Sequence, residues 1–161
     1  MEVEIVLKEH DSKRVSIRAY PAETIERLTP LELDRLNYET DYAYIYLEFD
    51  DASDIPEGEN IPRHPPNWSR TICFQVRDVW VPENWRRRGI ARQLYEVASD
   101  YSFRRGVPLC SDYRIHFEAY EFWRGLYSSG RARYEVPGGG RDGNPYYGRF
   151  VLAFPPPETL A

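Results

Sequence analysis

One stretch of the sequence, residues 76–91, constrains the fold more than any other. It reads Val-Arg-Asp-Val-Trp-Val-Pro-Glu-Asn-Trp-Arg-Arg-Arg-Gly-Ile-Ala, so an apolar run enters an arginine-rich loop that closes on Gly89. A helix is predicted to begin there, with its unpaired backbone N–H groups pointing back toward the strand. These donors, the positive end of the helix dipole and the missing Cβ of Gly89 favour a bound anion. The stretch therefore predicts a strand, an anion-binding loop and a helix.

The spacing of this loop carries a family resemblance. Arg86-x-x-Gly89-x-Ala91 follows a Val-x-Val strand end. It resembles the acyl-CoA signature of the GNAT N-acetyltransferases, (Gln/Arg)-x-x-Gly-x-(Gly/Ala), in which alanine is permitted at the last position. An arginine-rich turn before a helix is also common as a solvated helix start, so the motif needs support from elsewhere in the chain.

That support comes from the segment downstream. Residues 107–112 form a short apolar strand, and residues 116–126 form an aromatic helix that leads to a glycine turn. This order resembles the second half of the GNAT core, and the resemblance covers roughly residues 71–136. The texture of the carboxy-terminal half is similar to that of small GNAT proteins encoded by bacteriophages, which would make a host protein a possible acceptor.

Composition sets further bounds. With 161 residues and 42% hydrophobic content, the chain is expected to form a single domain over 1–161, with 155–161 as a tail. The net charge of −5 disfavours general nucleic-acid binding and favours a cationic or neutral partner. No apolar run is long enough for a membrane span and the first residues are acidic, so we expect a cytoplasmic protein. The oligomeric state, monomer or homodimer, stays open.

Two cysteines are too few for a disulfide framework. Cys73 and Cys110 sit in apolar strands without metal-ligand spacing, so both are interpreted as small core residues and no metal site is expected.

Periodicity and turn residues predict the remaining elements. Helices are expected at roughly 88–104 and 115–128, and one or two short helices within 21–37, with Pro30 at a helix start. Strands are expected at 2–8, 14–19, 42–49, 71–81, 107–111, 133–137 and 149–154. Residues 50–70 form an acidic, proline-rich loop, and its 50–59 part is a candidate docking surface.

The resemblance implies an α/β fold: a mixed, mostly antiparallel sheet of six or seven strands, with helices on both faces. The strands at 71–81 and 107–111 would splay apart into a V. Two strands are implied between the N-terminal helices and 71–81, whereas only 42–49 is a clear candidate. The hairpin at 2–19 is therefore expected to supply the missing pairing.

The same resemblance implies acetyl-CoA as the acyl donor. Its pantetheine arm would lie in the V against backbone groups, and its pyrophosphate would take the N–H groups of residues 87–91, with arginine charges nearby. The residues expected to bind it are Val79, Val81, Arg86, Arg87, Arg88, Gly89, Ile90, Ala91, His116 and Trp123.

Catalysis in this family often uses a carboxylate base on the central strand and a tyrosine acid on the second helix. Here Gln75 and Trp123 fill these two positions, and neither titrates suitably. Other residues could serve: Asp78 or Glu118 as the base, and Tyr120, Tyr127 or Tyr113 as the acid. Positioning alone is the other route, with the thioester carbonyl polarised by the Val79 N–H.

The expected function is acetyl transfer from acetyl-CoA to an amine, either a lysine or N-terminus of a protein or a small cationic amine. The alternative is a catalytically degenerate GNAT-fold module that binds a partner or inhibits a host factor. The missing acid and base favour the alternative, and the intact Arg86-x-x-Gly89-x-Ala91 spacing disfavours it. Nucleic-acid binding through Arg86, Arg87 and Arg88 is a third and weaker reading, because the whole chain is acidic.

Overall fold

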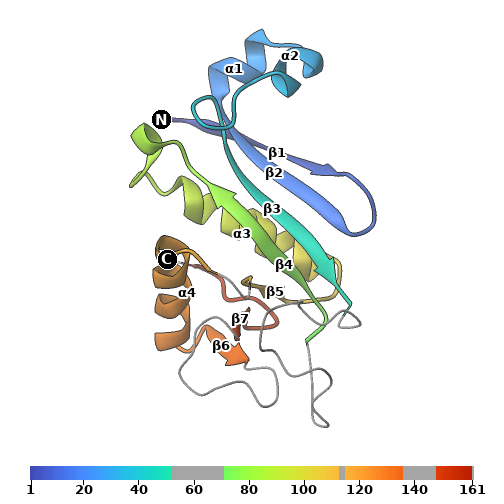
Figure 1. Cartoon of the computed structure of the whole chain (residues 1–161), viewed down its shortest axis with the longest axis vertical. Coiled ribbons are helices and arrows are strands. Elements are labelled where there is room, and N and C mark those ends of the chain that lie inside the picture. The colour runs from blue at the N-terminus through green and yellow to red at the C-terminus, as the bar shows by residue number, and fades with distance from the viewer. Residues whose placement is uncertain (52–70, 113–114, 136–147, 161) are drawn as a thin grey trace.

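The computed structural model describes residues 1–51, 71–112, 115–135 and 148–160. Its centre is a seven-stranded sheet with the order β1-β2-β3-β4-β5-β7-β6 (Figure 1). All neighbours run antiparallel except β4 and β5, which are parallel. The strands are β1 Val3–Glu9, β2 Arg14–Pro21, β3 Ala43–Asp50, β4 Cys73–Trp80, β5 Leu109–Cys110, β6 Ala132–Glu135 and β7 Arg149–Leu152. The predicted mixed, mostly antiparallel α/β fold is confirmed.

Four α-helices join the strands. They are α1 Ala22–Arg27, α2 Pro30–Asp34, α3 Ile90–Arg104 and α4 Phe117–Ser128. The two long helices begin two residues later than predicted and end where predicted. Pro30 opens α2 beside a capping box in which Thr29 and Glu32 bond reciprocally. Within the described ranges, no helix is long and apolar enough to cross a membrane.

The N-terminal hairpin completes the sheet, as expected. β1 and β2 pair along their length, and β2 then pairs with β3 over residues Arg14 to Ala19. The short helices α1 and α2 follow β2 and lie at the far end of the hairpin in Figure 1. A single strand, β3, therefore separates these helices from β4.

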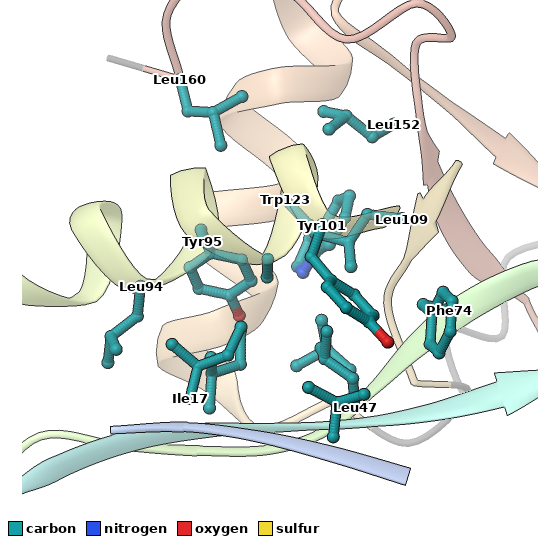
Figure 2. Close-up of a cluster of buried hydrophobic side chains, with 14 of the residues drawn as sticks. Ile17, Leu47, Phe74, Leu94, Tyr95, Tyr101, Leu109, Trp123, Leu152 and Leu160 are labelled. Atoms are coloured by element: carbon teal, nitrogen blue, oxygen red, sulfur yellow. The ribbon is translucent and has the colours of Figure 1, made fainter. Parts of the chain in front are cut away.

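The core lies between the sheet and the helix α3, which contacts β2, β3, β4 and β5. Alternating residues of the strands face it, including Ile17 and Leu47, and Leu94 and Ala98 on α3 meet them with no exposed surface. Figure 2 shows Ile17, Leu47 and Leu94 together with Trp123 of α4 and Leu152 of β7, which belong to the same cluster of buried residues. The helical stripe predicted for α3 is confirmed, and this packing fixes the direction in which α3 points.

One sequence expectation changes here, and another is confirmed. The last residues do not extend as a tail, because Leu160 is 6% exposed within the core and the Thr159 carbonyl accepts a hydrogen bond from Arg131. Cys73 and Cys110 are buried core residues, as predicted. Most of the expected loop at 50–70, from residue 52 on, and the candidate acid Tyr113 lie outside the described residues.

The predicted splay of β4 and β5 is visible in their pairing. The two strands pair only at Phe74 with Leu109 and at Gln75 with Cys110, and β4 continues to Trp80 without β5 beside it. On its other edge, β4 pairs with β3 throughout, except at Arg77, where the register shifts by one residue. This β-bulge and the open edge beyond Gln75 create the V-shaped split.

Candidate active site

The loop between β4 and α3 is held in shape by buried residues. Pro82 and Trp85 anchor a single 3₁₀ turn, Glu83–Trp85, in which the Trp85 N–H bonds to the Pro82 carbonyl at 2.8 Å. Beyond this turn, Arg87 and Gly89 both adopt left-handed conformations, with φ values of 63° and 78°. Alternation of backbone conformations around left-handed residues turns successive N–H groups toward one side, as in anion-binding nests.

No acceptor among the described residues receives the backbone N–H groups of residues 87–92. Hydrogen bonding within the helix begins with the N–H of Gln93, which bonds to the Gly89 carbonyl at 3.1 Å. No side chain caps the start of α3, and its first turn contains no acidic residue. The local geometry is thus a run of unsatisfied donors at the positive end of a helix, and it fits a pyrophosphate.

Arg86 braces this loop. Its Nε donates to the Val81 carbonyl at 3.0 Å, its guanidinium carbon lies 5.1 Å from the Trp80 ring centroid, and its Nη1 is 3.8 Å from Oε1 of Glu118. Arg87 and Arg88 are exposed and form no hydrogen bond or ion pair with the described residues. Two arginines of the predicted site therefore remain available to an anion, and Arg86 positions the backbone around them.

Backbone alternation in β3 shows which groups of β4 face the split. The Phe49 N–H donates to the carbonyl of Lys13, just before β2, so Phe49 turns its backbone groups away from β4. Its β4 partner Phe74 therefore turns its own backbone groups away from β3, and the Phe74 N–H donates to the Pro108 carbonyl at 3.1 Å. Val79 pairs with the β3 residue four positions before Phe49, so it has the same orientation. With no β5 residue opposite, the N–H and C=O groups of Val79 face the open side of the V.

Asp78 lies next to Val79 on the sheet face opposite α3. Its Oδ2 accepts a hydrogen bond from the Tyr44 hydroxyl at 2.6 Å. Burial, and then this hydrogen bond, raise the pKa of Tyr44, so the phenol stays protonated and donates to the carboxylate at neutral pH. This contact joins residues 34 positions apart and was not foreseen from the sequence.

The candidate site residues at and within α4 divide into those that solvent can reach and one that is buried. His116 is exposed at the start of the helix, and Tyr120 and Tyr127 lie one heptad apart, each about 6 Å from the Phe150 ring: 5.9 and 6.1 Å between centroids. Trp123 is only 1% exposed and its ring stacks on Phe150. Its side chain therefore belongs to the core, and the expectation that it contacts the cofactor is corrected.

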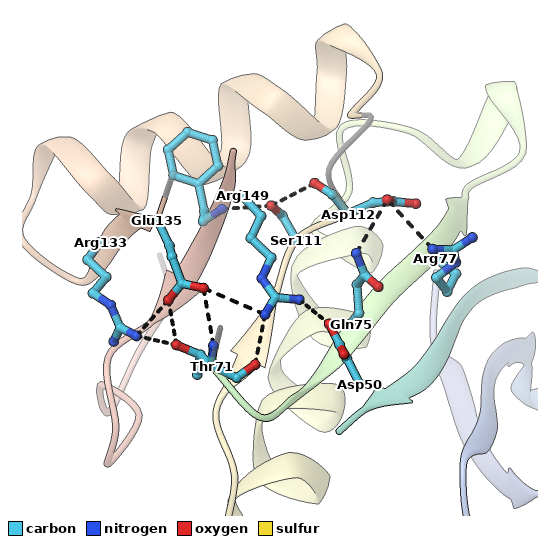
Figure 3. A network of polar contacts seen from close by, with 10 residues as sticks. Asp50, Thr71, Gln75, Arg77, Ser111, Asp112, Arg133, Glu135 and Arg149 are labelled. Carbon is cyan, nitrogen blue, oxygen red and sulfur yellow. Dashed lines mark hydrogen bonds and ion pairs between the residues drawn. The ribbon is translucent and has the colours of Figure 1, made fainter. Parts of the chain in front are cut away.

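A polar network that the sequence did not reveal closes the apex of the V (Figure 3). Gln75 is 6% exposed, and its Nε2 lies 3.4 Å from Oδ1 of Asp112, the second residue after β5. Arg77, the bulged residue, reaches the same carboxylate at 3.8 Å. The position of Asp112 directly after a strand that ends beside Gln75 is the only sequence signal that could have identified it.

Within the described residues, no group of three or more His, Cys, Asp and Glu side chains is placed to hold a metal ion. The groups gathered at this site are backbone N–H groups, arginines and the hydrogen-bonded carboxylates of Asp78 and Asp112, a set that suits a phosphorylated organic ligand and an amine.

Comparison with known protein families agrees with this geometry. The model of the acetyltransferase (GNAT) family matches residues 33–124, more than half of the 161-residue chain. The matched span runs from α2 through the loop between β4 and α3 to α4. The chain therefore belongs to the GNAT family. No curated protein and no solved structure matches it significantly.

Proposed function

We propose that the protein transfers an acetyl group from acetyl-CoA to an amine. The observation that carries this proposal is the run of N–H groups over residues 87–92, which find no acceptor in the described part of the chain and lie at the end of the open edge of β4. The N–H groups fit the pyrophosphate, and the open edge of β4 fits an extended pantetheine arm that takes the place of a neighbouring strand. Membership of the GNAT family supports acetyl transfer in general, and the substrate assignment rests on this site.

Acetyl-CoA, when bound, supplies a thioester carbon that an amine can attack. The N–H groups of residues 87–91, including those of Gly89, Ile90 and Ala91, would hold its pyrophosphate, with Arg87 and Arg88 adding charge. The backbone N–H and C=O groups of Val79 and the N–H of Val81 would hold the pantetheine arm. The Val81 carbonyl is left out because it already accepts a hydrogen bond from Arg86. The exposed His116 would lie along this arm at the start of α4.

The chemistry requires three proton transfers. The acceptor binds as an ammonium, loses one proton to Asp78 and, as the free amine, attacks the thioester carbon, while the Val79 N–H polarises the carbonyl oxygen. A C–N bond forms, the new amide nitrogen releases its second proton to solvent, the C–S bond breaks, and the thiolate takes a proton from a tyrosine of α4. Tyr127 is 51% exposed and Tyr120 is half-buried, so both hydroxyls remain candidates for this last step.

A second candidate function is partner binding without turnover, favoured by two observations. Trp123, in the position of the usual acid, is buried in the core, and Gln75, in that of the usual base, is hydrogen-bonded to Asp112. Release of thiol from acetyl-CoA in the presence of primary amines separates the two candidates, because a binding module releases none.

The cofactor site is tested by two glutamate substitutions at the two ends of α3. Gly89 and Gly106 have nearly the same left-handed φ, 78° and 79°, so a side chain strains the backbone equally at both. Gly89→Glu places a negative charge at the unpaired N–H groups, and we expect its CoA affinity, measured by titration calorimetry, to fall at least tenfold, roughly 1.4 kcal/mol.

Gly106→Glu is the matched control. It carries the same charge and the same strain at the opposite end of the helix, so its CoA affinity should equal that of the wild type. Equal affinities in both variants would place CoA elsewhere.

A further inference from the structure

Three aromatic rings from three segments meet on the sheet face opposite α3. Tyr44 and Trp80 are directly opposed on β3 and β4. Tyr38, from the turn after α2, stands nearly perpendicular to both: its ring centroid is 6.1 Å from that of Tyr44 at 75°, and 6.4 Å from that of Trp80 at 77°. Tyr38 is 47% exposed, so this corner can be reached from solvent. The three rings and Asp78, which accepts from Tyr44, are called the aromatic patch below.

The carboxylate of the patch has no cationic partner among the described residues. Asp78 is exposed and accepts only the Tyr44 hydrogen bond. The neighbouring Arg77 turns instead toward Glu48 and Asp112, at 3.9 and 3.8 Å. A negative charge next to the rings of Tyr38 and Tyr44, without a cationic partner among the described residues, is a receptor for a cation.

Cations already occupy ring faces on either side. Arg86 lies over Trp80, and Arg18 lies over Tyr42 with its guanidinium carbon 4.6 Å from the ring centroid. Tyr38 and Tyr44 between them hold no such group among the described residues. The vacant part of this surface is thus the part that surrounds Asp78.

The aromatic patch also lies beside Val79, the residue proposed to polarise the thioester carbonyl. Asp78 immediately precedes Val79, whose backbone faces the split. We propose that the aromatic patch is the acceptor subsite and that it takes a primary alkylammonium group, carried by a small amine or by a lysine side chain. This inference rests on the proposed acetyl transfer, and it adds the residues that hold and select the acceptor.

The rigidity of the patch follows from its supports. Tyr38 belongs to a turn in which Asn37 accepts the backbone N–H groups of Thr40 and Asp41, and the Asn37 N–H bonds to Asp41 Oδ2 at 2.8 Å. Tyr44 and Trp80 are held by strand pairing. A preorganised cage of this kind loses little side-chain entropy on binding.

The test uses the full chain and a cation that cannot be acetylated. Tetramethylammonium is titrated calorimetrically at constant ionic strength, with tert-butanol as a neutral probe of similar size. We expect tetramethylammonium to bind and tert-butanol not to bind. In Tyr38→Leu the affinity for tetramethylammonium should fall about 2-fold to 30-fold, the range of a cation–π contact. Phe103→Leu is the matched control, because Phe103 is 46% exposed on another surface and should leave the affinity unchanged.

Kinetics with acetyl-CoA then give a second readout. Tyr38→Leu should raise the acceptor KM with kcat unchanged, and Asp78→Asn should raise KM and lower kcat. Asp100→Asn, an exposed carboxylate of α3, should change neither. Butylamine and a lysine-containing peptide, compared as acceptors, distinguish a small amine from a protein source.

The outcomes separate this inference from the proposed function. If acetyl-CoA binds and thiol is released, but tetramethylammonium does not bind or Tyr38→Leu and Asp78→Asn keep the wild-type KM, the acceptor subsite is wrong and acetyl transfer stands. If no acyl-CoA binds, acetyl transfer fails, and cation binding by the patch is judged from calorimetry alone.

Discussion

At the scale of single residues, Arg149 has no exposed surface, and its charge is met by groups from three other strand ends. Its Nη1 is 2.7 Å from Asp50 Oδ2, and its Nη2 is 2.7 Å from the Thr71 carbonyl and 3.8 Å from Glu135 Oε1 (Figure 3). Burial of such a charge is tolerated only where paired groups surround it. Arg149 therefore ties β3, β4, β6 and β7 together next to the apex of the V.

Glu135 should make stability depend on pH. Its burial would raise the pKa of the carboxyl, but hydrogen bonds from Thr71 and the charge of Arg149 outweigh burial and hold that pKa below its usual value. A carboxyl with a lowered folded-state pKa stabilises the fold above the unfolded-state pKa, about 4.3. This contribution disappears as the pH falls through the folded-state pKa.

Urea unfolding of the wild type and Glu135→Gln from pH 7 to pH 3 measures this effect. We expect the variant to be less stable at pH 7 by about 1 to 3 kcal/mol, the value of hydrogen bonds to a charged group. The difference should shrink below pH 4, and the exposed Glu26→Gln should show none. A difference that stays constant with pH would assign the effect to packing.

At the scale of elements, the sequence located the helices well because their signals are local. A glycine opens α3, a period of 3.6 marks its buried stripe, and Gly106 ends it in a left-handed conformation. The loop between β4 and α3 was predictable for the same reason. The Tyr44–Asp78 and Gln75–Asp112 contacts were not, because they depend on strand register and on the bulge at Arg77, which no local pattern encodes.

Gly125 and Gly130, the two glycines in and after α4, are predicted to change stability in opposite directions when they are replaced by alanine. Gly125 lies inside α4 on its exposed side, and a Cβ there would meet no atom within 4 Å. Gly125→Ala should stabilise the protein by about 0.5 to 1 kcal/mol. Gly130, after the same helix, also has open space but a φ of 75°, so Gly130→Ala should destabilise it by about 1 to 2 kcal/mol.

Thermal unfolding of both variants shows directly whether each substitution raises or lowers the stability of the protein. Destabilisation by Gly125→Ala would mean that α4 requires the glycine for a contact outside the described residues.

At the scale of the whole molecule, the sheet is divided into two parts by the V. The part from β1 to β4 carries α3 and the aromatic patch, and the part from β5 to β7 carries α4. They are joined by the short β4–β5 pairing and by the core around Trp123 and Tyr95. The sequence predicted this division from the resemblance, whereas the packing of Leu160 back into the core and the burial of Trp123 required the three-dimensional fold.

The central claim, that the split binds acetyl-CoA, is tested most directly by thermal unfolding of the wild type with added ligand. A ligand that binds only the folded state adds about 2.7 kcal/mol of stability at one hundred times its Kd. We predict clear and similar stabilisation by acetyl-CoA and free CoA, and none by adenosine, because the proposed site would hold the pyrophosphate and the pantetheine arm. Stabilisation by adenosine equal to that by CoA, or by none of the three ligands, would contradict the account.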